Sequence, residues 1–273
     1  MEDSSKNNVS IASVKIADTE LFYAKIGQGK KTLVIFPGLN PKSLMPLAPR
    51  VANMYAKFLD TYTVYMFDRV TNPKEGYTIQ DMAKDTITAM DEIHIKDAYL
   101  LGNSMGGMLA QQIAVDRPDL VKKLVLCSTV PSLTEKSIKL FKEWEKAGIS
   151  KKQPEFAELL GSSVYSQAFY EKFKDNIIDA FGGMTDSDYS RFVIFVRAML
   201  KFDIRPELQK IKAPVLAFGA GQDKVFNAEQ TEEIAQKTGG KCFIYKEYGH
   251  AACDEAPDFL DRLWNFFEND KTN

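Results

Sequence analysis

Apolar and polar positions follow two different periods along this chain of 273 residues. Residues 11–17 and 20–26 alternate with a period of two and, with Asp18 and Thr19 between them, predict an antiparallel hairpin. Short, largely apolar runs beyond the hairpin predict further strands. These runs cover residues 31–36, 63–67, 98–101 and 121–127.

Segments with helical spacing separate most of these strands. Residues 78–93 carry apolar side chains at spacings of three and four, which is typical of an amphipathic helix. Helices are also predicted over residues 49–59 and 105–116. Strands that alternate with helices in this way predict an α/β fold with a mostly parallel sheet and helices on both faces. Ligands of such sheets bind outside the carboxyl ends of the strands.

This alternation stops after residue 130. Four helical stretches follow one another without a strand between them, at residues 133–147, 155–160, 166–181 and 187–200. Strands then return at 215–218 and 242–245, and helices at 228–238 and 259–267. We therefore expect residues 131–210 to form an inserted helical cap on a core made of residues 11–130 and 211–273. Residues 1–10 are polar, and we expect them to be a disordered tail.

Composition and charge narrow the classes of function. The apolar fraction of 45% and the charged fraction of 26% are those of an ordinary globular protein. A net charge of −2 argues against a nucleic-acid binder. No stretch is apolar enough for membrane insertion, and the first residues lack the apolar core of a signal peptide. Three cysteines without C-x-x-C spacing favour free thiols in a reducing compartment, so we expect a cytoplasmic protein. We expect it to be a monomer or a homodimer.

The most informative short motif is Gly102-Asn103-Ser104-Met105-Gly106. It joins the predicted strand at 98–101 to the predicted helix at 105–116. A serine on so sharp a turn is held in a strained conformation that lifts its hydroxyl clear of the sheet. The free N–H groups at the start of the helix face whatever the oxygen attacks. The motif predicts that Ser104 is a nucleophile, although glycine-rich turns also join strands to helices in proteins without catalysis.

A serine hydroxyl needs a base to take its proton, and the chain offers two histidines. His94 lies between a helix and the amino end of a strand, which is the wrong edge of the sheet. His250 follows the last strand, at the carboxyl edge, and is the better candidate. Asp223 follows the strand before it and is the candidate carboxylate that orients the histidine. The chain order Ser104, Asp223, His250 agrees with these roles.

With these residues the chain resembles the α/β-hydrolase fold family over residues 11–267. The resemblance rests on F-P-G-L-N, G-N-S-M-G-G, G-A-G-Q-D-K-V and Y-G-H. It implies a serine hydrolase with an oxyanion hole made of two backbone N–H groups, those of Met105 and Leu39. The family often has histidine where Pro37 stands, and glycine where Val70 stands. Neither departure removes a predicted catalytic group.

The resemblance implies two-step acyl transfer on a small to medium, largely apolar carboxylic ester. Thioesterase and lactonase activity fit the same three residues. A carbon–carbon bond hydrolase of the meta-cleavage-product type is a further alternative, although its members tend to carry a tryptophan where Ala251 stands. A non-catalytic sensor built on the hydrolase fold is the alternative from another class. We expect no cofactor, and two histidines with unpaired cysteines do not provide a typical zinc site.

The predicted cap is rich in aromatic residues, most of which are expected to pack its helices together. A minority could line an apolar pocket over Ser104. Arg191 and Arg197 are candidates for binding a substrate carboxylate, but we expect both to be surface residues.

Overall fold

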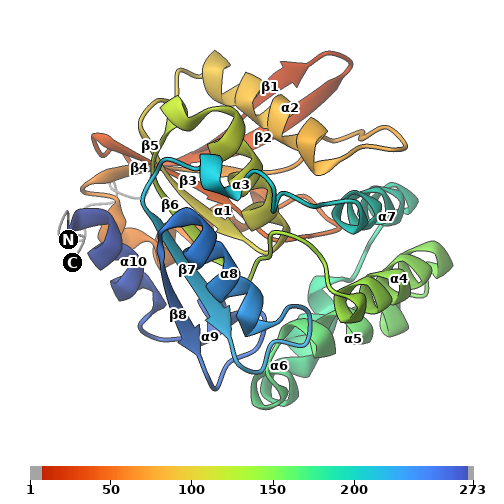
Figure 1. The fold of residues 1–273 in the computed structure, drawn as a ribbon. Coiled ribbons are helices and arrows are strands. Elements are labelled where there is room, and N and C mark those ends of the chain that lie inside the picture. The colour runs from red at the N-terminus through yellow and green to blue at the C-terminus, as the bar shows by residue number, and fades with distance from the viewer. Residues whose placement is uncertain (1–7, 270–273) are drawn as a thin grey trace, which may run out of the picture.

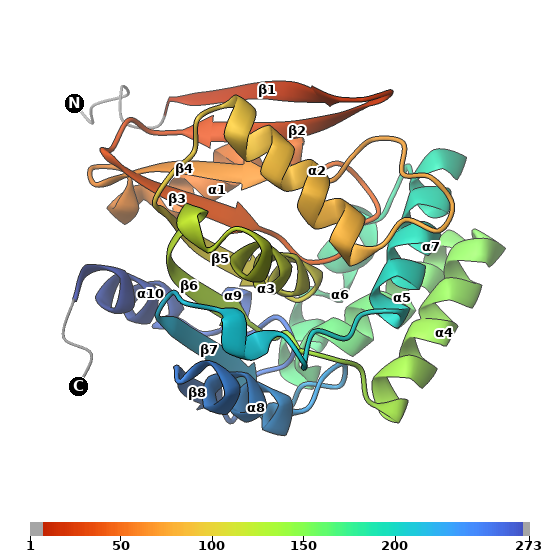
Figure 2. The same cartoon turned by 45° about the horizontal axis from the view of Figure 1, so that its top comes forward.

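A single eight-stranded sheet runs through the molecule (Figures 1 and 2). The computed structural model describes residues 8–269. The strands are β1 (Val9–Ile16), β2 (Thr19–Ile26), β3 (Lys31–Phe36), β4 (Tyr62–Phe67), β5 (Ala98–Asn103), β6 (Val121–Cys127), β7 (Val215–Ala220) and β8 (Lys241–Tyr245). Their order across the sheet is β1-β2-β4-β3-β5-β6-β7-β8. The pairs β1–β2 and β2–β4 are antiparallel, and the other pairs are parallel.

The prediction of a disordered tail over residues 1–10 is wrong for Val9 and Ser10. These two residues pair with Ile26 and Lys25 in the first hairpin. Residues 1–7 of that expected tail lie outside the described residues. The expected α/β fold with a mostly parallel sheet is confirmed, and each of the eight expected strands is present.

Helices cover both faces of the sheet. They are α1 (Ala48–Met54), α2 (Ile79–Glu92), α3 (Met105–Asp116), α4 (Glu135–Ser150), α5 (Gln153–Val164), α6 (Gln167–Ala180), α7 (Asp186–Leu200), α8 (Ala228–Thr238), α9 (Ala252–Glu255) and α10 (Phe259–Glu268). Helices α2, α3 and α8 contribute to one apolar cluster, and α1, α9 and α10 to the other. Within residues 8–269, no helix is long and apolar enough to cross a membrane.

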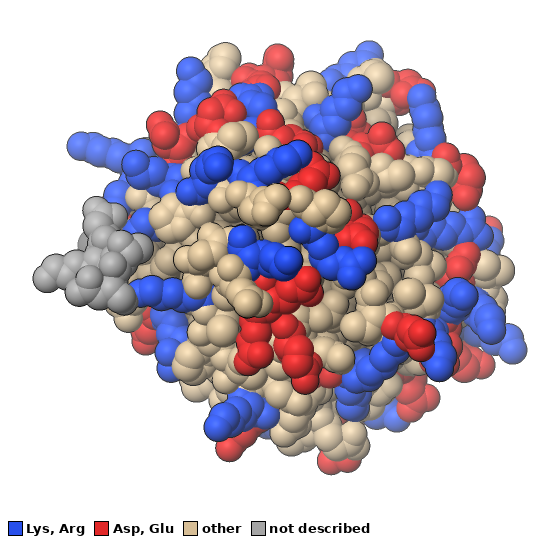
Figure 3. Space-filling view, in the orientation of Figure 1, with Lys and Arg blue, Asp and Glu red and all other residues tan. Residues whose placement is uncertain are grey.

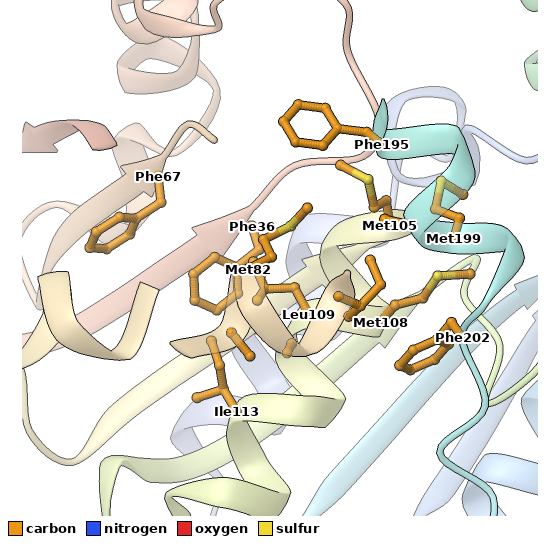
Figure 4. Packing of buried hydrophobic residues seen from close by; sticks show 14 of the residues in the cluster. Phe36, Phe67, Met82, Met105, Met108, Leu109, Ile113, Phe195, Met199 and Phe202 are labelled. Atoms are coloured by element: carbon orange, nitrogen blue, oxygen red, sulfur yellow. The ribbon is translucent and has the colours of Figure 1, made fainter. Parts of the chain in front are cut away.

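Side-chain alternation along the central strands supplies both clusters. In β3, Val34 and Phe36 belong to the first cluster, whereas Leu33 and Ile35 belong to the second. Successive side chains of a strand point to opposite faces, so a fully apolar strand feeds two cores at once. The first cluster extends into α7, where Phe195 and Met199 pack near residues of α3 (Figure 4).

Helices α4 to α7 lie between β6 and β7 in the sequence and form a group at one side of the sheet (Figures 1 and 2). The two ends of this insertion meet, because Ser132 bridges Asp203 and the N–H of Ile204 donates to Pro131 O at 2.9 Å. The aromatic residues Phe141, Phe156, Phe192 and Phe195 are fully buried. The division into cap and core domains stays a prediction.

Positive and negative side chains are interspersed over the face seen in Figure 3, and surface ion pairs join many of them. One hollow, of about 290 Å³, lies between α4 and α7 and is lined in part by Gly148, Ile149 and Arg197. Its lining contains none of the three predicted catalytic residues.

Candidate active site

Ser104 stands at a strained turn between β5 and α3. Its backbone has φ 52° and ψ −119°, a conformation that residues other than glycine rarely adopt. Hydrogen bonds hold it there: its N–H donates to Cys127 O at 2.9 Å, and its carbonyl accepts from Gly107 N and Thr129 Oγ1, both at 2.8 Å. The turn leaves the serine half-buried at the carboxyl edge of the sheet.

Two glycines make this turn possible. A Cβ on Gly106 would lie 1.9 Å from Phe36 O, and a Cβ on Gly102 would lie 2.5 Å from Gly106 O. No larger residue fits where β3, β5 and the start of α3 approach so closely. Packing around Ser104 therefore requires both glycines of the sequence G-N-S-M-G.

The structure brings the three predicted side chains together. Ser104 Oγ lies 2.8 Å from His250 Nε2, and His250 Nδ1 lies 2.8 Å from Asp223 Oδ2. The side chains of His250 and Asp223 are only 6% and 3% exposed. An ionised carboxylate can only accept, so the proton belongs on Nδ1 and leaves Nε2 free to accept the serine proton. His94, the rejected alternative, lies just past the end of α2.

The environment of this pair fixes its orientation. Asp223 Oδ1 accepts from the N–H groups of Val225 at 2.7 Å and Phe226 at 2.9 Å, which leaves Oδ2 for the histidine. The Phe226 ring meets the His250 ring at an interplanar angle of 67°, with centroids 5.2 Å apart. The imidazole therefore has an apolar wall on one side and a fixed carboxylate at one end.

Leu39 and Met105 are placed beside Ser104, as expected of oxyanion donors. Met105 follows the serine directly, and Leu39 follows Gly38, at which a Cβ would lie 3.3 Å from Ser104 Cβ. Within the described chain, neither the Leu39 N–H nor the Met105 N–H has a hydrogen-bond acceptor. Two unpaired donors thus flank the serine hydroxyl.

The loop that carries Leu39 is held at both ends. The Asp68 carboxylate accepts from Ser43 Oγ at 2.6 Å and Leu44 N at 3.1 Å, and Arg69 Nη2 donates to Pro37 O. Asp68 and Arg69 directly follow β4, at the same edge of the sheet as Ser104. Asp68 and Arg69 therefore hold the loop that carries Leu39, a role that the sequence analysis did not assign to them.

Arg191 occupies an unexpected place. It was expected at the surface, but it is 8% exposed and donates from Nη2 to Pro41 O at 3.3 Å. That expectation is wrong, because α7 lies against the loop at 37–41 and buries this side of the helix. Arg197 lies two turns further on, is partly exposed, and pairs with Glu145 and Glu75.

Glu255 links the histidine loop to the helical insertion. Its carboxylate accepts from Gly249 N at 3.3 Å, from Ser166 N at 3.0 Å and from Ser166 Oγ. The sequence analysis missed this residue, because it lies in α9, a helix of four residues that is too short to show a periodic pattern.

Cys253, in the same helix, is not an alternative nucleophile. A hydrogen bond with Cys127, followed by burial, raises the pKa of the Cys253 thiol well above its usual value. A protonated thiol is a poor nucleophile. Among residues 8–269, no group of three or more His, Cys, Asp or Glu side chains could hold a metal ion.

Comparison with known proteins shows the family of the chain. Residues 69–256 match the family described as serine aminopeptidase, S33. The 3-oxoadipate enol-lactonase 2 of Acinetobacter baylyi is 24% identical over 248 residues, which cover 88% of this chain and 90% of that protein.

Two solved structures resemble the whole fold. An α/β-hydrolase from a Medee basin deep-sea metagenome library superposes with a TM-score of 0.86 at 18% identity, over 96% of this chain and 99% of that one. The enol-lactonase from Burkholderia xenovorans gives 0.82 at 22% identity, over 94% of this chain and all of that one.

Proposed function

The chain belongs to the serine aminopeptidase S33 family of α/β-hydrolases, and on that basis we propose that it is a serine hydrolase of small carboxylic esters. The observation that carries the proposal is the unbroken row of contacts from Ser104 Oγ through His250 to Asp223. Each contact is 2.8 Å long, which is within the range for proton transfer. Ser104, His250 and Asp223 are the proposed nucleophile, base and orienting acid.

In the first half of the reaction, Ser104 Oγ attacks the ester carbonyl carbon while its proton moves to His250 Nε2. The carbonyl oxygen becomes an oxyanion that accepts hydrogen bonds from Leu39 N–H and Met105 N–H. The tetrahedral intermediate then expels the alcohol, which takes the proton from His250. Asp223 stabilises the imidazolium throughout, and the products of this half are an acyl-serine and a free alcohol.

In the second half, His250 takes a proton from water, and the resulting hydroxide attacks the acyl carbon. The new intermediate expels Ser104, whose oxygen recovers the proton from His250, and the carboxylic acid leaves. One oxyanion donor lowers the activation free energy of such a step by about 3 kcal/mol. The Leu39 and Met105 N–H groups have no acceptor in the described chain, which supports their proposed role as oxyanion donors.

The surroundings of the serine support a largely apolar acyl or alcohol group. Met105, Phe226 and Phe195 are all buried, and Figure 4 places Met105 close to Phe195 of α7. These side chains present no charge to a bound ester. The proposed role of the helical insertion is therefore to supply the apolar side of the substrate site.

Lactone hydrolysis is a second candidate. A lactone is a cyclic ester and needs the same three residues, and two of the similar proteins are enol-lactonases. Carbon–carbon bond cleavage has less support, because Ala251 follows His250 where such hydrolases tend to carry a tryptophan.

A fluorophosphonate probe and a substrate panel test the proposal. We expect the probe to label Ser104, and a panel of p-nitrophenyl esters, thioesters and lactones to show catalytic turnover of at least one ester. Labelling without turnover of any ester or lactone would favour a sensor, and retained turnover in Ser104→Ala would remove Ser104 from the mechanism. The variant Ser187→Ala, at an exposed position near the start of helix α7, is the matched control.

A further inference from the structure

Two arginines are buried on either side of the loop that carries Leu39. Arg69 is 5% exposed and Arg191 is 8% exposed. Arg69 reaches Pro37 O from the end of β4, and Arg191 reaches Pro41 O from α7. Guanidinium groups are seldom buried unless an anion accompanies them, because removal of a charge from water is costly.

In this protein the more exposed arginines have carboxylate partners, whereas the two buried arginines have none in the described chain. Four more exposed arginines each pair with a carboxylate: Arg117, Arg197, Arg205 and Arg262. Neither buried arginine has a carboxylate within ion-pair distance in the described chain. Their protein acceptors are backbone carbonyl oxygens, and both Nε atoms lack a partner among the described residues. Arg191 Nη1 also forms no hydrogen bond with a described residue.

One negative charge lies close to the two positive ones. The Asp68 carboxylate accepts from Ser43 Oγ, Leu44 N and Arg69 N, so the donors that it binds are not guanidinium groups. Burial, opposed by Asp68 and reinforced by Arg191, lowers the pKa of Arg69 to about 10, so Arg69 is still charged at neutral pH. Arginine side chains in general carry a positive charge in proteins. The group therefore carries one uncompensated positive charge.

Both arginines contact the loop that approaches the proposed nucleophile. The loop between the two arginines contains Gly38, which abuts Ser104. Arg191 is one helical turn before Phe195, whose ring lies beside Met105 (Figure 4). An ester held at Ser104 and extended toward α7 would bring its far end to Arg191.

We propose that Arg191, supported by Arg69, binds a carboxylate at the far end of the substrate, so that the preferred substrate is an ester of a dicarboxylic acid. This inference rests on the proposed esterase function and names its substrate class. A carboxylate suits the site because it brings one negative charge and accepts two guanidinium protons in one plane. The nearby side chains of Phe195 and Met105 are apolar, so the proposal places an apolar spacer between the two ends of the substrate.

Two esters that differ only at the far end test the proposal. We compare mono-p-nitrophenyl adipate with its methyl-capped diester, after subtracting the uncatalysed rates. The wild-type protein is expected to favour the free acid in kcat/KM by about tenfold or more, mainly through KM, as a charged hydrogen bond would provide. In Arg191→Met this ratio falls to about one. Arg197→Met, on the same helix, keeps the wild-type ratio.

A wild-type ratio near one would overturn the proposal. An Arg191→Met variant that loses activity on both esters with the ratio unchanged would also overturn it, because Arg191 would then only support the loop. If Arg191→Met does not fold, Arg191→Lys replaces it and is expected to retain a preference for the acid.

A binding measurement separates this inference from the proposed function. Calorimetric titration of Ser104→Ala and of Ser104→Ala/Arg191→Met with hexanoate needs no turnover. We expect the double variant to bind hexanoate at least about fivefold more weakly. Equal affinities would refute the arginine site, whereas weaker binding by the double variant of a protein that hydrolyses no ester would refute only the esterase.

Discussion

The N–H of Ala251 donates to Val164 O at 3.0 Å, so the residue that follows the histidine is attached to the end of helix α5. Nearby, Lys224 Nζ donates to Ser162 O at 2.9 Å, beside Asp223. The C-terminal end of α5 therefore contacts both loops that carry His250 and Asp223. A movement of this part of the insertion would move His250 with it.

Glu255 is expected to act as a positioning residue for His250. Replacement by Ala removes the acceptor shared by Gly249 and Ser166 and should lower kcat about tenfold with little change in KM. The free energy of unfolding should fall by about 1–3 kcal/mol, because buried donors lose their partner. Steady-state kinetics and denaturant unfolding measure the two effects, with the exposed Glu247→Ala as control. A loss of stability with kcat unchanged would assign Glu255 a purely structural role.

The backbone strain at Ser104 predicts an unusual order of stability. At φ 52° a Cβ is unfavourable, so the free energy of unfolding of Ser104→Gly should exceed that of Ser104→Ala by about 1 kcal/mol. Neither variant should hydrolyse esters. Urea unfolding followed by circular dichroism provides the comparison. The usual order, with Ala the more stable, would show that the turn carries no such strain.

Asp223→Asn tests the orientation of the imidazole. An amide can donate toward Nδ1, which favours the tautomer whose Nε2 carries the proton and cannot accept one from Ser104. We expect kcat to fall about 10⁴-fold while the fold is retained. Fluorophosphonate labelling should slow in parallel with ester hydrolysis. Wild-type rates in Asp223→Asn would exclude the proposed role of Asp223.

The ion pair at the C-terminal helix predicts acid sensitivity. Burial tends to raise the pKa of Glu268, but hydrogen bonds from Lys31 and Tyr62 outweigh it and leave this pKa below the usual 4.5. A carboxyl whose pKa is lower when folded stabilises the protein above its unfolded pKa, and this stability is lost as pH falls.

Glu268→Gln should therefore cost about 1 kcal/mol at pH 7, and its difference from wild type should shrink between about pH 5 and pH 3. Thermal unfolding across this range measures the effect, with the exposed Glu92→Gln as control. A difference that stays constant with pH would contradict the assignment.

Periodicity was sufficient for most of the fold. The helix over residues 105–116 and the strands over 31–36 and 121–127 have the predicted bounds, since each is long enough to show its period. The helix predicted over residues 49–59 is instead broken at Tyr55, which has φ −94° and ψ 16° and is followed by a single 3-10 turn. Burial of Tyr55 and Phe58 in the core determines this path, and local sequence does not record it.

Helix α5 is longer than predicted for a related reason. The prediction covered residues 155–160, but the helix continues through Gly161 to Val164. Glycine lowers helix propensity, yet a Cβ at Gly161 would lie 2.8 Å from both Ile177 and Tyr170 of α6. Close packing between helices requires the glycine, and only the tertiary structure reveals that requirement.

Some residues of the candidate site could likewise be predicted from the sequence, and others could not. Ser104, Asp223 and His250 could be predicted because motif, chain order and sheet edge agree. The buried position of Arg191 depends on how α7 lies against the loop at 37–41, and the role of Glu255 depends on a contact 89 residues away in sequence. Contacts between distant segments leave no periodic trace in a single sequence.

The separation of Ser104 from His250 along the chain has a consequence for folding. These two residues are 146 positions apart, and the base follows the last strand of the sheet. Their contact cannot form until β7 and β8 have joined the strands made earlier, and such long-range closures are slow. During refolding or synthesis, the proposed catalytic site is therefore among the last parts of the molecule to form.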